Sequence, residues 1–127
     1  MDIREESKTM LKEAISRLEE FRTLVQGWNG YGGTPPSGQA IDECIVWLLA
    51  LPKLAFPPTA MVSGDGEVGL LWELATCSVS LEVGFKGNGT CGFLTVTDAD
   101  HSFEAEGIPI HGLMPMELAM GLSSFLL

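Results

Sequence analysis

Basic residues are scarce in this sequence, which has 7 lysines and arginines against 17 aspartates and glutamates, a formal net charge of −10 at pH 7. Nucleic-acid backbones and anionic lipids are recognised through positive charge, so neither is expected as a direct partner. Beyond Lys53 the sequence has one further basic residue, Lys86, which leaves the C-terminal part almost purely anionic. The balance favours a basic partner, although an acidic surface also serves solubility alone.

Cysteine is rare as well, with Cys44, Cys77 and Cys91 as the full set. They form no Cys-x-x-Cys motif, and an odd number without metal-ligand spacing predicts reduced, buried thiols. The charged start of the chain, residues 1–8, differs from a signal peptide. No apolar run approaches the length of a membrane span. These features predict a cytoplasmic protein.

Histidine is limited to His101 and His111. A nucleophile and base made of Cys91 and His111 would need an orienting third residue, and none is evident. Asp98, Asp100 and His101 lack the further ligands of a calcium loop and the spacing of a zinc site, so a polar turn is the expectation there. We therefore predict no catalytic residues, no metal and no cofactor.

The apolar residues that are present, 46% of the 127, suffice for the core of one α+β domain over residues 1–127. Apolar residues at spacings of three and four predict a helix from Glu5 to Gln26, which Gly27 ends. Ser37 is placed to cap a second helix over residues 38–51, apolar on most sides. A short third helix begins at Pro115.

From Ala60 onward the apolar period changes to two, which predicts a four-stranded antiparallel meander, with residues 60–63 as a short fifth strand at its edge. Tight turns are expected at Asp65-Gly66, Ala75-Thr76 and Gly87-Asn88, and a loop at residues 98–101. These turns keep one face apolar, and the helices are expected to cover it. The predicted pairs are Val68–Val83, Leu70–Leu81, Trp72–Val79, Val79–Val96, Leu81–Leu94, Leu94–Ala105 and Val96–Phe103.

The same register predicts a second sheet face that is acidic. Phe93 is expected there as an aromatic anchor between Glu82 and Glu106 on the neighbouring strands. Carboxylates around an aromatic side chain are typical of a surface that binds a basic partner. The simpler interpretation is the solvated side of an antiparallel sheet. The residues predicted to bind a partner are Glu67, Leu71, Glu73, Glu82, Phe93, Glu104 and Glu106.

A glycine-rich loop, Trp28–Pro36, lies between the first two helices. It lacks the lysine and the serine or threonine of a phosphate loop, and it does not follow a strand. Close glycines and two aromatic residues favour either a loop that grips a ligand or a corner that Trp28 and Tyr31 pin into the core.

This loop and the segment after it resemble a family of small bacterial and phage-associated proteins, in which a Trp-(Asn/Asp)-Gly-Tyr corner precedes an Asp-Gly-x-x-x-x-x-Trp strand. The resemblance covers roughly residues 18–83 and stops at Val83. The family has no assigned activity, so the resemblance implies no functional residue. It implies a compact prokaryotic domain carried on a mobile element, and hence the cytoplasm of a bacterial host. The matching residues are Trp28-Asn29-Gly30-Tyr31-Gly32, Leu51-Pro52, Pro57-Pro58, Gly64-Asp65-Gly66-Glu67 and Leu71-Trp72-Glu73.

Size, charge and the lack of catalytic groups together favour a non-enzymatic protein that inhibits a basic or nucleic-acid-binding partner, as a phage-type anti-defence or anti-CRISPR protein would. The alternative is a self-associating assembly protein whose C-terminal apolar helix forms a dimer seam. A third class, a small-ligand or enzymatic domain, would need a concave pocket beside the loop Trp28–Pro36. The seam residues are Leu118, Leu122, Phe125, Leu126 and Leu127.

Overall fold

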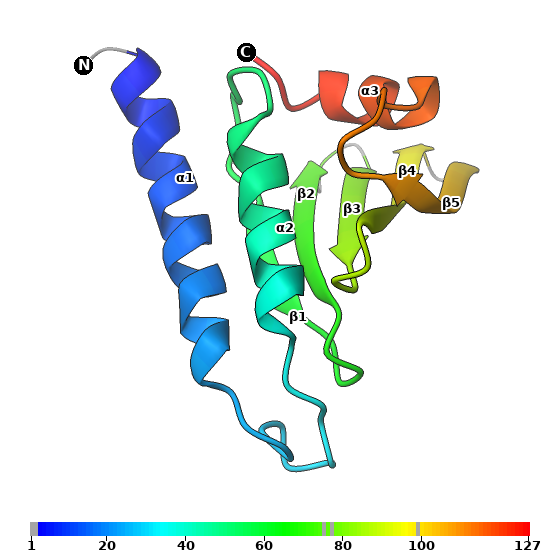
Figure 1. The fold of residues 1–127 in the computed structure, drawn as a ribbon. Helices are drawn as coiled ribbons and strands as arrows, with labels where there is room; N and C mark the ends of the chain where they lie inside the picture. Colours follow the sequence, from blue (N-terminus) through cyan, green and yellow to red (C-terminus); the bar gives the residue numbers. More distant parts are fainter. Residues whose placement is uncertain (1–2, 75, 77, 99) are drawn as a thin grey trace.

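The computed structural model describes residues 3–74, 76, 78–98 and 100–127. It has the predicted α+β architecture, a five-stranded antiparallel sheet with helices against one face (Figure 1). The elements in chain order are α1 (Ile3–Glu20), the 3-10 turn η1 (Phe21–Thr23), α2 (Gly38–Leu49), β1 (Thr59–Val62), β2 (Val68–Leu74), β3 (Val79–Phe85), β4 (Thr90–Asp98), β5 (His101–Pro109) and α3 (Met116–Ser123).

The helices form largely where apolar periodicity and caps predicted them. Ala14 and Leu18 of α1 are buried in the core. The helix ends before the predicted Gln26, because the backbone is already extended at Leu24, with φ −68° and ψ 142°. The cap of α2 is confirmed, since Ser37 Oγ accepts a hydrogen bond from the backbone N–H of Ala40 at 3.0 Å.

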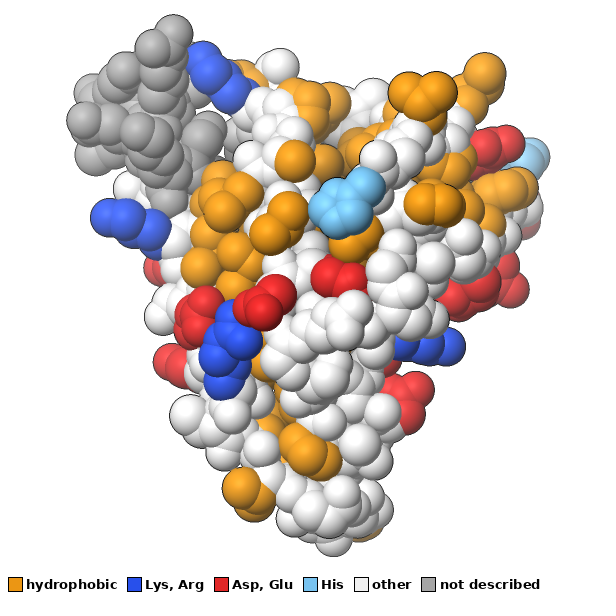
Figure 2. Space-filling view, viewed as in Figure 1, with side chains coloured by type: hydrophobic (Ala, Val, Ile, Leu, Met, Phe, Trp, Pro, Cys, Tyr) orange, Lys and Arg blue, Asp and Glu red, His pale blue; other side chains and the backbone are white. Residues whose placement is uncertain are grey.

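Helix α2, apolar on most sides, packs on more than one neighbour, namely α1, η1, β2 and β3, and part of it remains exposed. Trp47 is buried and contacts the rings of Trp72 and Phe85 edge to face. Val46 and Leu49 are 53% and 59% exposed. They add to the hydrophobic side chains that are scattered over the helix-bearing face of the molecule (Figure 2).

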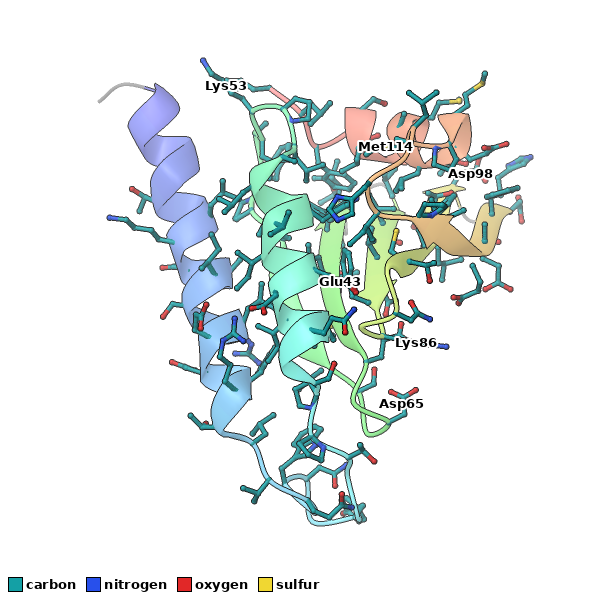
Figure 3. All side chains as sticks on the ribbon, viewed as in Figure 1. Glu43, Lys53, Asp65, Lys86, Asp98 and Met114 are labelled. Atoms are coloured by element: carbon teal, nitrogen blue, oxygen red, sulfur yellow. The ribbon has the colours of Figure 1, made fainter. Side chains whose placement is uncertain are left out.

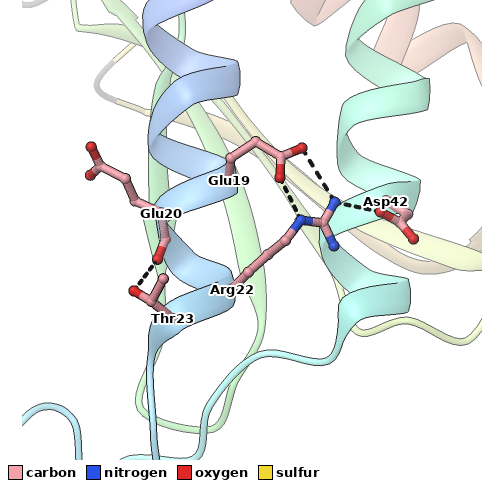
Figure 4. A network of polar contacts seen from close by, with 5 residues as sticks. All are labelled: Glu19, Glu20, Arg22, Thr23 and Asp42. Atoms are coloured by element: carbon pink, nitrogen blue, oxygen red, sulfur yellow. Dashed lines mark hydrogen bonds and ion pairs between the residues drawn. The ribbon is translucent and has the colours of Figure 1, made fainter.

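An exposed ion-pair network joins η1 to α2 (Figure 4). Arg22 Nε lies 2.6 Å from Glu19 Oε2, and Arg22 Nη2 donates to Asp42 Oδ1. These hydrogen bonds, first to Glu19 and then to Asp42, raise the pKa of the Arg22 guanidinium. Each such surface pair contributes about 0–1 kcal/mol, so the network orients the two helices more than it stabilises them.

The strands lie in the order β1-β2-β3-β4-β5, each antiparallel to its neighbours, and the predicted edge strand before β2 is present as β1. Gly66 forms the β1–β2 turn with φ +87°, a conformation that glycine adopts without strain. Helices α2 and α3 pack on the same face of this sheet (Figure 1), which we call the covered face. The sheet residues whose side chains point the other way form the open face.

The pairing of β2 with β3 differs from the predicted register by two residues. Leu70 lies opposite Val83 and Trp72 opposite Leu81, where the sequence predicted Leu81 and Val79. A shift of two leaves every side chain on its predicted face. The connection spans more than the predicted turn Ala75-Thr76, since Leu74 pairs directly with Val79. Ala75 itself lies outside the described residues.

The pairing of β3 with β4 differs by one residue, and this difference inverts β4. Val83 lies opposite Phe93 and Glu82 opposite Leu94, whereas the sequence predicted Leu81 opposite Leu94. Phe93 is consequently buried on the covered face with 4% exposure, while Leu94 points to the open face with 36% exposure. The predicted orientation of Phe93 is wrong.

The reason for this inversion is the β3–β4 connection. Phe85 pairs with Cys91, so the loop between the paired residues is longer than the predicted turn Gly87-Asn88. Two glycines in it, Gly87 and Gly89, have φ of +83° and +81°. The loop is held against α2, because the Glu43 carboxylate accepts the N–H of Gly89 at 2.9 and 3.1 Å. A tertiary contact thus fixes the register.

The pairing of β4 with β5 is also offset by one residue from the prediction, between two bulges. Thr95 lies opposite Phe103 and Phe93 opposite Ala105. The one-residue offset between β4 and β5 cancels the one between β3 and β4. Glu104 is therefore on the open face, as predicted, and lies opposite Leu94. The predicted loop at residues 98–101 includes position 99, which lies outside the described residues.

Candidate protein-binding surface

The open face is an acidic surface with an apolar centre. Leu94 lies between Glu82 on β3 and Glu104 on β5, each directly opposite it in the sheet. Leu71 continues the same row on β2, opposite Glu82. In the described part of the chain no helix packs on this side, so these side chains meet solvent. The open face thus has charged groups around a central aliphatic side chain.

A row of glycines crosses the open face next to this centre. Gly69, Gly84 and Gly92 are directly paired across β2, β3 and β4. Without side chains they leave the backbone bare, and carboxylates from neighbouring positions fold over it. A Cβ placed on Gly84 would overlap the carboxylate of Glu67, and one placed on Gly92 would overlap that of Glu106. The glycines thus give the glutamates room to converge.

The convergence forms a shallow depression of about 190 Å³. It is lined by four glutamates, by Gly84 and Gly92, and by Phe93 and Leu94 of β4. The glutamates are Glu67, Glu82, Glu104 and Glu106. Lys86 Nζ lies 3.8 Å from Glu67 Oε2, the one ion pair that the described residues make with this cluster. Asp65 and Lys86 lie at the same turn end of the sheet (Figure 3). Most of the negative charge here is therefore uncompensated within the described chain.

The pKa of the Glu67 carboxyl reflects first its burial and then the charges around it. Burial raises the pKa of its carboxyl above the usual value, Lys86 lowers it, and Asp65, Glu106 and Glu82 raise it further. Like charges in mutual repulsion gain most from a cation brought between them. Within the described residues no group of three His, Cys, Asp or Glu has the arrangement of a metal site.

The predicted binding residues divide clearly in the structure. Six share the open face, namely Glu67, Leu71, Glu73, Glu82, Glu104 and Glu106. Phe93 does not, because the register of β4 turns it into the core. The sequence reasoning missed Leu94, Gly84 and Gly92. The glycines could have been noticed, since Gly84 and Gly92 are equally spaced from the glycine-rich turn between them.

The loop Trp28–Pro36 is held by its own hydrogen bonds. Trp28 Nε1 donates to the carbonyl of Thr34 at 2.9 Å. Asn29 Oδ1 accepts the N–H groups of Tyr31 and Gly33 at 2.9 and 2.8 Å. Tyr31 is 93% exposed, so the expectation that it pins the corner into the core is wrong.

A hollow of about 350 Å³ lies where this loop meets the sheet. Its lining includes Thr34 and Pro35 from the end of the loop, together with Asp65, Glu67 and Lys86, but neither of the loop's aromatic residues. It borders the open face through Glu67, and three of its lining side chains are charged, those of Asp65, Glu67 and Lys86. The hollow therefore continues the open face toward the loop.

Two of the cysteines are buried, and His101 lies in an exposed turn. Burial, with a smaller contribution from Glu106, raises the pKa of the Cys91 thiol to about 11, so it stays protonated at neutral pH. Cys44 and Cys91 are free, buried thiols, as predicted, whereas Cys77 lies outside the described residues. His101 Nδ1 is 2.8 Å from Asp98 Oδ1, in the polar turn that the sequence predicted.

The C-terminal helix does not present the predicted dimer seam. Leu118, Leu122 and Phe125 are between 0% and 2% exposed and belong to the molecule's own core. Leu126 is partly buried against that core, and Leu127 is 63% exposed. Of the five predicted seam residues, Leu127 is thus the one that is largely exposed. The helix packs on the sheet with Gly121 against Thr95 and Leu81.

Comparisons with known proteins found no family model, no curated protein and no solved structure that matches this chain. The resemblance to bacterial and phage-associated proteins therefore has no support beyond the quoted residues. None of the helices in the described ranges has the length and hydrophobicity needed to cross a bilayer.

Proposed function

We propose that this protein is a non-enzymatic binding protein that docks its open face onto a basic surface of a partner macromolecule. The observation that supports this most is the crowding of four glutamates in one depression with a single lysine beside them. Such a cluster costs free energy in the isolated protein, and a basic partner relieves it. Leu94 supplies the apolar contact at its centre.

The kind of partner follows from charge and shape. Carboxylates at sheet spacing resemble the charge of a phosphate backbone, so a nucleic-acid-binding groove is a matching surface. Occupation of that groove would inhibit the partner, as an anti-defence protein of a phage inhibits its target. The net charge of −10 would speed association with a basic target at low ionic strength.

The test uses the protein as bait in a bacterial lysate, with a charge-reversed open face as the variant. Glu82→Lys with Glu104→Lys removes charges on both sides of Leu94. We expect this pair to weaken capture of a basic partner at least about tenfold, because close interfacial charge pairs are each worth roughly 1.5 kcal/mol or more. Excess nucleic acid should compete with the unaltered protein for the same partner.

The matched control reverses two charges elsewhere. Glu13→Lys with Glu20→Lys changes the net charge equally on α1, where both side chains are exposed. The control should keep capturing the partner at the same salt concentration. Equal capture by both double variants would remove the open face from the proposal and leave an effect of net charge alone.

A further inference from the structure

The rest of the described chain covers the β1 edge of the sheet and adds no strand to the β5 edge. At the β1 edge, α1 packs alongside, and Arg17 Nε donates to the backbone carbonyl of Ala60 at 2.9 Å. A helix thus covers and partly satisfies this edge, as natural proteins commonly do. At the other end, β5 is the last strand, and no further strand of the described chain pairs with it (Figure 1).

The orientation of the β5 backbone follows from two side-chain hydrogen bonds. Thr95 Oγ1 on β4 donates to the carbonyl of Phe103, and Thr97 Oγ1 donates to that of His101, each at 3.4 Å. These carbonyls therefore face β4. Backbone groups alternate in direction along a strand, so the N–H and C=O of Ser102 and Glu104 point away from the sheet. Both residues are exposed.

Irregular pairing limits the available length of the β5 edge at both ends. Gly107 has φ +71°, and the pairing with β4 shifts between Cys91 and Phe93. Pro109 has no N–H to offer. The pairing shifts again between Val96 and Asp98, so the regular part of β5 is the stretch from Ser102 to Ala105, long enough to pair with a short strand.

The charge of β5 selects what can pair there. The side chains of Glu104 and Glu106 lie beside this edge on the open face, and the strand contains no lysine or arginine. A second copy of the chain paired antiparallel to β5 would bring its own carboxylates next to these, which is unfavourable. An extended segment with basic side chains gains from the same carboxylates.

We infer that β5 accepts a basic, extended segment of the partner as an added sixth strand. The segment would pair its backbone with Ser102 and Glu104, and alternate side chains would reach the glutamates of the open face. Its lysines or arginines would extend over Glu104 toward Leu94. This inference rests on the proposed function, because it names how the partner of the open face is held.

The test uses a short synthetic peptide that alternates lysine and threonine as the probe. Amide hydrogen exchange of the full chain is followed by NMR with and without peptide. We expect the amides of Ser102 and Glu104 to exchange at least about tenfold more slowly in the complex, because strand pairing takes their N–H groups out of solvent. Binding that leaves both exchange rates unchanged, or no binding of the peptide, would overturn the inference.

Substitution at the edge supplies the matched pair of variants. Ser102→Pro removes an N–H that faces away from β4, and should weaken peptide binding about tenfold, while Ser102→Ala should leave it unchanged. A peptide with N-methylated backbone, tested on the unaltered protein, should lose binding similarly. Equal affinity of the methylated and unmethylated peptides would contradict strand addition whether or not the proline variant folds.

The outcomes also separate this inference from the proposed function. If Glu82→Lys weakens peptide binding but the exchange of Ser102 and Glu104 does not change, the peptide lies on the open face and the edge inference fails alone. If exchange slows at both residues and Glu82→Lys has no effect, the edge binds a strand and the proposed role of the open face fails.

Discussion

Glu67 comes directly before β2, and its carboxylate lies over the backbone of Gly84 on the neighbouring strand β3. The carboxylate fills the space where a Cβ of residue 84 would stand. The arrangement depends on glycine, since any larger residue at position 84 displaces Glu67. It also brings Glu67 toward Glu82 and Glu106. Burial raises the pKa of Glu67 most, and the charges of these two neighbours add to that effect. Because Gly84 on β3 has no side chain, the glutamates can gather over it and form the most acidic part of the open face.

Gly84→Ala tests this arrangement. The new methyl group meets the end of a flexible side chain, so Glu67 should swing away at little cost, with the free energy of unfolding changed by less than about 1 kcal/mol. The matched control is Gly121→Ala on α3, where the Cβ would come 2.6 Å from Cγ2 of the buried Thr95. Overpacking there should cost about 1–3 kcal/mol. Urea unfolding of both variants compares them, and equal losses would contradict the account of Gly84.

The register of β4 predicts opposite consequences for two adjacent residues. Phe93→Ala removes a buried ring and should lower the free energy of unfolding by about 3–5 kcal/mol. Leu94→Ala removes a side chain at the surface and should lower it by less than about 1 kcal/mol. Chemical denaturation of both variants gives the answer, and the reverse order would restore the register that the sequence predicted.

The raised pKa of Glu67 makes stability depend on pH. A carboxyl whose pKa is higher in the folded than in the unfolded state binds its proton more tightly when the protein is folded. Its contribution to the free energy of unfolding is therefore fully present below pH 4.5, the ordinary pKa of the group. That contribution is lost as the pH rises through the folded pKa. Glu67→Gln cannot ionise, so it should unfold at higher urea concentration than the unaltered protein at neutral pH. The difference should shrink toward about pH 4, and a difference that grows there would contradict the sign.

The buried thiols should be unreactive in the folded protein. Burial raises the pKa of Cys44 to about 12 and that of Cys91 to about 11, the latter with a contribution from Glu106. In a Cys77→Ser background, labelling by a thiol reagent at neutral pH should be at least about a hundredfold slower than for a free thiol. Denaturant should restore the ordinary rate. Rapid labelling without denaturant would show that one of the two sites is accessible.

Much of the fold could be predicted because it depends on local patterns. Ser37 begins α2 with the expected cap, and the alternation along β2, β3 and β5 places their side chains on the faces that the structure shows. Alternation determines only which face each side chain is on. The predicted faces of β2 and β3 were therefore correct although their predicted pairing was wrong by two residues. The glutamates of the candidate surface lie on these strands and on the turn before β2, and all of them were identified from the sequence.

By itself the sequence determined the helices, the number of strands and an open face rich in glutamate, because hydrophobic periodicity and caps act over a few residues. Only the tertiary structure decided the orientation of β4, where both faces carry apolar residues and periodicity gives no preference between Phe93 and Leu94. The choice is made by the loop before β4. Glu43 binds the N–H of Gly89, and the backbone of Gly87 lies so close to α2 that a Cβ would come 2.6 Å from Ser37 Oγ. These contacts join residues that are far apart in the sequence, so they form only when helix and sheet have come together.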